Sequence, residues 1–489
     1  MGILKYILTF LVLSSSVHGF SQIAFRRVFG GNGYDKAEGI AQLPDSSYII
    51  TGSSSSFEDA PSQAFLLKLN KQGFHVWSKE YGGAEFEEGR RVLFVPNYGY
   101  YIIGTSSSNG SGGFDGYVVF TDLAGNKQWE KWYDNGGWER FHDAILLSDT
   151  SIVMMGETDA NQEQSPDQYL VRIDKAGAVI WNYQMGGVGV DYFQKGVLVT
   201  DTTFSVVGTG YLADSLKSKA FVGLFHKDGT LIWDTLAGSN GTYLLNDVQL
   251  VSNQLKCVGE NIKTGRTDQD YYFLFLTSQG DFVQQEDIID DYSNRYVGFV
   301  NYTALPSNKY FLTSQSNNPQ YSFPVGEDFT ITRFAAAFYW DGYGVNQYNA
   351  TGQDQANHII QTNDGFAVVV GYHSDPGFST GGSSMFVVKL GNDNNFPAGG
   401  QPTIYSILKV EDLENNSTIS IYPNPFTESI QIDSENVVEY MEVLDLTGKQ
   451  IYVSSSQITS INTSDWEKGT YIIRCQSNGA WYTSKLLKF

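Results

Sequence analysis

The chain has 489 residues, of which 41% are apolar and 15% aromatic, with 51 glycines, 12 prolines and a formal net charge of −22. This length and apolar fraction exclude a wholly disordered chain and leave room for two or three domains. Aromatic residues fit pleated strands and glycines supply tight turns, so the composition favours an all-β protein. The negative charge argues against nucleic acid or an anionic membrane as a partner, because both would be repelled.

The first segment predicts export. Lys5 is followed by an apolar run, Tyr6 to Leu13, and then by small residues, which is the pattern of a signal peptide over residues 1–21. The run is too short to span a bilayer as a helix, and we expect no transmembrane segment elsewhere. The only cysteines, Cys257 and Cys475, lie in apolar strand-like runs, so we interpret them as buried thiols rather than a disulfide.

Residues 22–390 contain a repeat. A glycine that closes an apolar run, a turn glycine and a tryptophan four residues later recur 52 residues apart, with one final step of 51. Three markers that share one period would not arise from chance composition. The markers are Gly52, Gly104, Gly156, Gly208 and Gly259; Gly73, Gly125, Gly177, Gly229 and Gly280; and Trp77, Trp129, Trp181 and Trp233.

Each copy contains four strand-like runs, which in the first copy lie at 38–43, 48–52, 64–69 and 75–79. Tight links join the first two runs and the last two, as in hairpins, whereas the middle link is long and polar. Four-stranded units with a period near 50 predict a β-propeller in which each unit is one blade, and a solenoid is the alternative. The closing residues continue through Ser314 and Gly371, which predicts seven blades.

Two copies depart from the pattern. In the sixth we expect the third strand at Ala336–Trp340, after a loop from Gln315 to Phe334. The seventh ends at Leu390 without a fourth strand, but the segment Ile23–Gly31 copies a fourth strand, with Phe25 in the place of the tryptophan. We therefore expect the N-terminal strand to complete the last blade and close the ring.

A linker rich in Gly, Asn and Asp, residues 391–416, leads to a second module, residues 417–489, whose short alternating strands predict a small β-sandwich. Its motifs IYPNPF, VLDLTGK, KGTYI and KLLKF resemble the type A sorting domain of the type IX secretion system. The residues that carry this resemblance include Tyr422, Pro423, Asn424, Pro425, Gly448, Lys449, Gly469 and Tyr471.

This resemblance implies a Bacteroidota-type cell, the type IX machinery as a partner, and export through the periplasm to the outer surface or the medium. It also implies that the sorting domain is removed during export. The body of the chain is similar to secreted β-propeller repeat proteins of the same bacteria, which share no single activity. We expect a monomer.

Motifs for catalysis or metal binding are weak. The stretch Gly377–Gly381 matches G-x-S-x-G, but a strand follows it instead of the helix that a nucleophile elbow requires, so we discard it. The six histidines form no zinc motif. We therefore predict no cofactor and no metal, and leave open only a structural calcium ion held by loop oxygens.

One place in the repeat carries an acid in five copies. We interpret these acids as structural, each accepting backbone N–H groups in the turn that enters an inner strand. Asp115, Asp167 and Asp270, which stand before third strands, receive the same interpretation. The repeated acids are Asp35, Glu87, Glu139, Asp191 and Asp354.

Positions that differ between copies are better ligand candidates, because scaffold demands are shared by all blades. Three and four residues past the repeated acids stand the pairs Glu38 and Gly39, Arg90 and Arg91, His142 and Asp143, Gln194 and Lys195, and Asn357 and His358. We expect these places near the propeller axis, on the face that carries the long loops. The predicted binding mouth comprises Arg90, Arg91, His142 and His358, with Tyr321, Phe323 and Phe329 from the sixth copy.

These features predict an exported or cell-surface binding or adhesion protein with a glycan or peptide ligand and no catalytic residues. A solvated channel mouth without a ligand is the plainer interpretation of the same residues. The alternative function is a secreted polysaccharide lyase or glycoside hydrolase that uses Glu38, His142 or His358. A purely structural surface-layer role is a third, since a fold does not decide function.

Overall fold

The computed structural model describes two compact units, residues 1–409 and 410–489. The predicted signal peptide, Tyr321, Phe323, Asn424, Pro425, Gly448 and the G-x-S-x-G stretch lie outside the described residues. In the described part, no helix is long and apolar enough to cross a membrane. The described ranges are 24–56, 61–109, 113–160, 165–212, 217–288, 294–302, 309–316, 328–334, 346–347, 354–374, 382–390, 404–406, 419–423, 426–434, 437–445, 449–454, 459–477 and 480–488.

The first unit is a β-propeller whose described residues form seven sheets. Blade one is β2 (Asp35–Gln42), β3 (Tyr48–Ser54), β4 (Gln63–Leu69) and β5 (His75–Tyr81); blade two is β6 (Glu87–Val95), β7 (Gly99–Ser106), β8 (Asp115–Thr121) and β9 (Lys127–Tyr133); blade three is β10 (Glu139–Leu146), β11 (Ile152–Thr158), β12 (Asp167–Ile173) and β13 (Val179–Met185); blade four is β14 (Tyr192–Leu198), β15 (Thr203–Leu212), β16 (Lys217–His226) and β17 (Leu231–Ala237).

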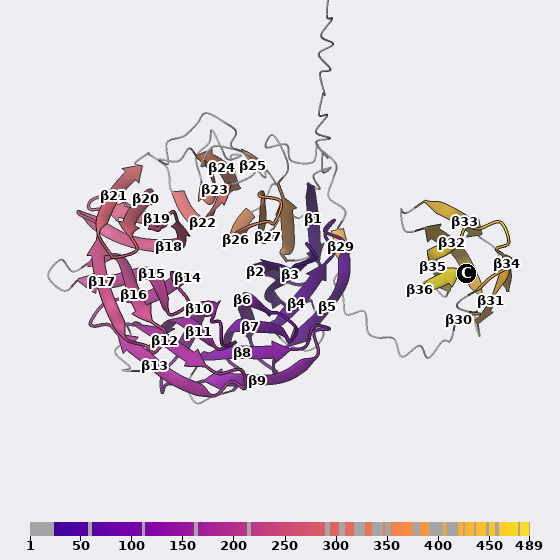
Figure 1. The fold of residues 1–489 in the computed structure, drawn as a ribbon, viewed down its shortest axis with the longest axis horizontal. Helices are drawn as coiled ribbons and strands as arrows, with labels where there is room; N and C mark the ends of the chain where they lie inside the picture. Colours follow the sequence, from indigo (N-terminus) through magenta and orange to yellow (C-terminus); the bar gives the residue numbers. More distant parts are fainter. Residues whose placement is uncertain are drawn as a thin grey trace, which may run out of the picture. The chain divides into compact units, whose positions relative to one another are not determined.

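The remaining blades follow the same antiparallel order. Blade five is β18 (Gly241–Val251), β19 (Gln254–Lys263), β20 (Asp270–Thr277) and β21 (Phe282–Ile288); blade six is β22 (Asn294–Tyr302), β23 (Lys309–Ser316), β24 (Asp328–Phe334) and β25 (Asn346–Gln347); blade seven is β26 (Asp354–Gln361), β27 (Ala367–His373), β28 (Ser384–Lys389) and β1 (Phe25–Gly30). Figure 1 shows the sheets around a common axis, with β6, β10, β14 and β18 nearest to it and β9, β13, β17 and β21 at the periphery.

The N-terminal strand closes the ring. β1 runs antiparallel to β28, with Phe25 opposite Lys389 and Phe29 opposite Met385. On its other edge it pairs in parallel with β29 (Ile404–Ser406). The segment expected to be only a linker therefore contributes a fifth strand to this sheet, which covers backbone groups that an edge strand would leave unpaired.

In six blades the glycine that closes the second strand lies opposite a bulge in the first strand, whereas the bulge of blade six lies opposite Ser314. In blade two the β6–β7 register shifts between Gly89 and Arg91, so Arg90 is an extra residue. A Cβ placed on Gly104 would lie 1.8 Å from the carbonyl oxygen of Glu88. A Cβ would lie 1.8 to 2.0 Å from the corresponding carbonyl oxygen if it were placed on Gly52, Gly156, Gly208, Gly259 or Gly371. A side chain at these places would collide with the bulged strand.

The turn glycines and tryptophans form one contact between neighbouring blades. Gly125 has a φ of +79°, and a Cβ on it would lie 2.8 Å from the Trp77 ring of the preceding blade. Trp129 meets Gly177 in the same way. Phe25 of β1 occupies the equivalent place against Gly73, as its position in the repeat predicts.

Blade six corrects one expectation. Its third strand is β24, Asp328–Phe334, and not Ala336–Trp340, so Phe329 lies in a strand instead of a loop. Asp328 opposes Ser316 just as Asp115 opposes Ser106 in blade two. The acid that begins the third strand in blades two and three also begins this strand, whereas the apolar run at Ala336–Trp340 predicts a later position.

The second unit is a small β-sandwich. Its sheets are β30 (Ile419–Tyr422), β31 (Ser429–Ser434) and β34 (Ser460–Asn462), and β33 (Gln450–Ser454), β32 (Val438–Asp445), β35 (Gly469–Ser477) and β36 (Ala480–Lys488). Side chains of both sheets, among them Ile430, Ile461, Met441 and Ile473, share one core. Of the motif residues, Tyr471 packs against this core and Tyr422 is half exposed. Cys475 here and Cys257 in the propeller are free and buried, as predicted.

Candidate functional site

The first-strand bulges present side chains to a polar pocket at the propeller axis. An extra residue in a strand allows two neighbouring side chains to be aimed at the same side. Bulges occur at Glu38, Arg90, His142, Gln194, Asn246 and Asn357. All six line the pocket, together with Arg91, Asp143, Lys195 and His358.

The structure thus brings together Arg90, Arg91, His142 and His358 from blades two, three and seven. Sequence reasoning missed blade five, whose residues are Asn246 in the pocket wall and Asp247 beside it. The acid that marks the register in earlier blades is replaced there by Tyr243. Adding 52 to Gln194 and Lys195 would have found both residues.

Three pocket residues connect neighbouring blades. Asp143 accepts a hydrogen bond from the Gly196 amide at 3.1 Å, and Asp247 accepts one from the Phe299 amide at 2.9 Å. His358 Nδ1 lies 3.1 Å from the Ile40 amide in the same relation. Histidine therefore occupies, in blade seven, the role that a carboxylate has in blades three and five.

His358 faces donors at both ring nitrogens. The Ile40 amide at Nδ1 and the Arg91 guanidinium at Nε2 can only donate, so the single acceptor nitrogen of a neutral imidazole cannot satisfy both. Burial lowers the pKa of His358 well below its ordinary value, and the charges of Lys195 and Arg91 lower it further. The ring is therefore neutral at neutral pH and has one N–H and one acceptor nitrogen.

Two cationic donors face the same nitrogen. Arg91 Nη1 lies 2.7 Å and Lys195 Nζ 3.1 Å from His358 Nε2. Burial lowers the pKa of Lys195, although Asp143 opposes this effect. The Ile40 amide, Arg91 and Lys195 thus direct three donor groups at a ring that has one acceptor nitrogen.

The carboxylate that pairs with Arg91 does not supply the missing acceptor. Asp143 Oδ1 lies 3.0 Å from Arg91 Nε but is not aligned for a hydrogen bond, and Lys195 Nζ is 4.0 Å from the same oxygen. Asp143 is almost fully buried, with 2% of its side chain exposed. The centre of the pocket therefore has more donors than acceptors.

The rest of the wall is paired. Arg90 forms an ion pair with Glu88 at 3.0 Å, and Asn357 donates to the Ala37 carbonyl oxygen at 2.9 Å. His142 Nδ1 lies 3.0 Å from the Phe193 carbonyl oxygen, which requires the proton on Nδ1 and leaves Nε2 as a base. Burial, with the charge of Arg90, lowers the pKa of His142 to about 3.

The pocket is small, with a volume of about 60 Å³. Since a water molecule needs about 10–15 Å³ of a volume measured in this way, a carboxylate group fits. A larger hollow of about 390 Å³ lies between blades four and five, against Leu236, Leu274 and Phe282. No titratable side chain lines it, so the axial pocket is the better candidate for recognition of a polar group.

The repeated acids lie away from this pocket, at the entry to the inner strands. Asp35 accepts from the Gly31 amide at 2.8 Å, Glu87 from the Gly83 amide at 2.9 Å, and Asp191 from the Gly187 amide at 3.2 Å. Glu139 accepts from the Thr158 hydroxyl at 2.7 Å. Asp354 begins β26.

Comparisons with known proteins identify the tail. Residues 420–488 match the family model of the secretion system C-terminal sorting domain. The chain is therefore an exported protein of the type IX secretion system, secreted or held at the cell surface, and it interacts with that machinery. No characterised protein matches the sequence.

Solved structures resemble the chain at low identity. The propeller domain of the Trilobed protease from Pyrococcus furiosus is 11% identical, with a TM-score of 0.40, covering 77% of this chain and 99% of that one. Sqt1 from Chaetomium thermophilum is 12% identical, with a TM-score of 0.38, covering 75% and 100%. PorZ, described as a surface component of the type IX secretion system of Porphyromonas gingivalis, is 10% identical, with a TM-score of 0.28, covering 95% and 85%.

Proposed function

We propose that this exported propeller is a binding protein for acidic glycans, and that a ligand carboxylate enters the axial pocket. The observation that carries the proposal is the convergence of Arg91 and Lys195 on His358 Nε2. A carboxylate placed there would accept from both cations, and charge-assisted bonds of this kind are the strong ones. It would also supply a negative charge in blade seven, where His358 occupies the place that Asp143 and Asp247 have in blades three and five.

The surroundings favour a glycan over a peptide. Tyr34, Phe86 and Trp138 stand one residue before the repeated acids of blades one to three, at the end where the inner strands begin. Tyr34 is 64% exposed. Phe86 packs against Phe114, and Arg140 lies over the Trp138 ring, so Tyr34 offers the exposed aromatic face on which a sugar ring could stack. A chain of uronate residues combines such rings with the carboxylate that the pocket requires.

Binding also has an expected proton signature. Burial lowers the pKa of Lys195, and a bound carboxylate would raise it because a nearby negative charge favours the ammonium form. The affinity for the ligand should therefore fall as the pH rises through the range in which Lys195 titrates, and calorimetry at several pH values measures this.

The test is titration of the mature protein with uronate oligosaccharides and with their carboxyl-reduced forms. Arg90→Ala with Arg91→Ala should weaken uronate binding by at least about 100-fold, since hydrogen bonds to charged groups contribute about 1.5–3 kcal/mol each. Because Asp143 would lose its cation in this variant, a second variant combines Arg91→Ala with Asp143→Asn and leaves the charge of the pocket unchanged.

The control is the double variant Lys71→Ala with Lys127→Ala. It removes two exposed cations far from the axis and should not alter the affinity for uronates. Equal binding of the reduced and native oligosaccharides, or wild-type affinity in both pocket variants, would overturn the proposal. Binding of acidic peptides in place of uronates would retain the pocket and reject the glycan.

One observation favours a second candidate, a polysaccharide lyase. His142 Nε2 is unprotonated, and Arg90 and Arg91 stand near it to neutralise a uronate carboxylate. A base in this setting can remove the proton next to the carboxylate carbon, after which the glycosidic C–O bond breaks and a C=C bond forms. The leaving oxygen would take a proton from water. An increase in near-ultraviolet absorbance on incubation with polyuronates, abolished by His142→Ala, would establish this activity.

A further inference from the structure

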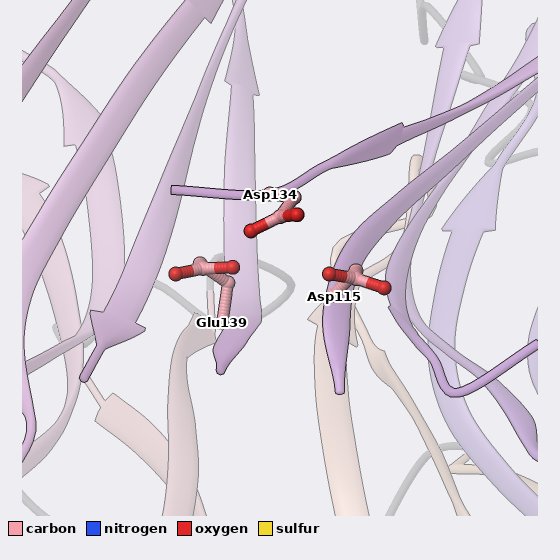
Figure 2. A group of neighbouring side chains, drawn as sticks. All are labelled: Asp115, Asp134 and Glu139. Atoms are coloured by element: carbon pink, nitrogen blue, oxygen red, sulfur yellow. The ribbon is translucent and has the colours of Figure 1, made fainter. Parts of the chain in front are cut away.

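Three carboxylates meet at the seam between blades two and three, away from the axial pocket. Asp115 begins β8, Asp134 follows β9, and Glu139 begins β10. One oxygen from each lies within 4.8 Å of the others. Figure 2 shows the carboxylates of Asp115 and Glu139 on either side of Asp134, with all three directed into the same space. Charges of one sign at these distances repel unless something between them compensates.

Asp115 has no partner of its own. Its side chain is fully buried, and neither carboxylate oxygen receives a hydrogen bond. The expectation that it accepts a backbone N–H is therefore wrong. A buried carboxylate that lacks both hydrogen bonds and a counter-charge is costly, and native structures contain few such groups. Burial, with the charge of Asp134, raises the pKa of Asp115 to about 6.

The seam between blades one and two shows what the scaffold itself requires. The residues 52 positions earlier are Gln63, Gly82 and Glu87. Gln63 Nε2 donates to the Gly83 carbonyl oxygen at 2.7 Å and Glu87 accepts from the Gly83 amide at 2.9 Å, so both residues have partners within this seam. A Cβ on Gly82 would lie 2.3 Å from Glu87 Oε2, which leaves no room for an acid there.

The next two seams are also satisfied internally. The residues 52 positions after Asp115 and Asp134 are Asp167 and Gly186, and Asp167 accepts from Gln184 Nε2 at 2.8 Å. One step further they are Lys219 and Gly238, and Lys219 Nζ donates to the Ser239 carbonyl oxygen at 2.8 Å. Only the seam with Asp134 has an acid in place of this glycine among these four. The carboxylate of Asp134, which replaces the glycine, faces the unpartnered carboxylate of Asp115.

We propose that Asp115, Asp134 and Glu139 bind a calcium ion that joins blade two to blade three. All three ligands are carboxylates, which hard cations prefer, and no histidine or thiolate accompanies them. Thr158 already occupies Glu139 Oε1 as a donor, so Glu139 binds through its other oxygen. Water supplies the remaining ligands on the side of Asp134, which is exposed. Calcium accepts such an irregular, partly hydrated set more readily than magnesium does.

The test uses thermal unfolding and calorimetry of the full chain after removal of divalent ions. Calcium at pH 7.5 should raise the melting temperature by at least about 3 °C, because a ligand that binds only the folded state stabilises it. Titration should show one tight site per chain. Asp115→Asn and Asp134→Gly should each weaken this site by at least about 10-fold, and magnesium should give a smaller shift.

A double variant and a control variant distinguish loss of the calcium site from a general change in stability. Asp115→Gln with Asp134→Gly rebuilds the seam of blades one and two, and it should raise the melting temperature without calcium while removing the calcium response. Asp167→Asn changes the matching acid of the next seam, which is already paired, and should leave the response intact. The calcium shift of the wild type should decrease at pH 5, because protons then compete for the carboxylates.

Three results would overturn the proposal: no calcium-dependent shift in the wild type, an undiminished shift in Asp115→Gln with Asp134→Gly, or an equal shift with magnesium.

Discussion

The inner strands and the outer edges of the blades use the same repeat in opposite ways. At the edges, one contact is copied from blade to blade, in which a tryptophan packs on the turn glycine of the next blade. At the axis, one backbone feature, the bulge, is copied, but the side chains on it include arginine, histidine and glutamine. What the scaffold needs is repeated, and what would meet a ligand differs between blades.

The seam of blades two and three shows the same principle at the edge of the scaffold. Glycine is the repeated residue at the place of Asp134 because neighbouring groups occupy the space that a side chain would need. Where that glycine is lost, a second change, the unpartnered Asp115, accompanies it. A departure from the repeat that leaves a buried group unsatisfied is therefore a better guide to a site than polarity alone.

The largest expected effect follows from breaking the contact that closes the ring. Deleting residues 22–28 removes most of β1, including Phe25 and Val28, which are 2% and 0% exposed. The loss should exceed about 5 kcal/mol, given about 1.5–3 kcal/mol for each large apolar side chain buried and the strand pairing besides. Calorimetry and size-exclusion chromatography should show a much lower melting temperature and association through the exposed edge of β28. An unchanged melting curve and a monomer would show that the ring does not depend on β1.

A smaller but still severe effect should follow from filling the space opposite a bulge. Gly104→Ala would bring a methyl group to 1.8 Å from the Glu88 carbonyl oxygen, so the backbone of the bulged strand would have to shift. We expect destabilisation of about 4 kcal/mol or more, measured by chemical unfolding, as for other overpacked or strained sites. Gly187→Ala is the matched control, since a Cβ there meets nothing within 4 Å. If the two variants unfold alike, the bulge is not what selects glycine.

The sequence predicted the fold well because repetition averages out local ambiguity. The markers Gly52 and Gly73 each satisfy a steric need that recurs, so their spacing indicates the blades and the place of Phe25. Blade six was the exception, since the apolar run after β24 outweighed the acid at Asp328. A single copy without its glycine gives too little signal to locate a strand.

The candidate sites were predicted only in part. Counting from the repeated acids found Arg91 and His358. It did not show that His358 takes the place of a carboxylate, because that role depends on the amide of Ile40, which lies more than 300 residues away in the chain. Asp115 was misinterpreted because its equivalents have partners that its own environment lacks. Hydrogen-bond satisfaction depends on tertiary neighbours, which residue spacing does not describe.

The smallest expected effect separates the propeller from its sorting domain. We expect the exported protein to lose residues after the linker, because exposed polar segments are where proteases act. Mass spectrometry of secreted material should find no peptide from the β36 region, and retention of Phe489 would contradict this.

The sandwich has its own core, so a chain ending at Lys409 should melt within about 1 °C of the propeller transition in the full chain. A chain ending at Leu390 is the informative comparison, since it also lacks β29, which pairs with β1 over three residues. Loss of about 1 kcal/mol of edge pairing should lower its melting temperature by about 2–4 °C relative to the longer truncation. Equal melting of the two truncations would mean that the linker strand does not protect the edge of the strand that closes the ring.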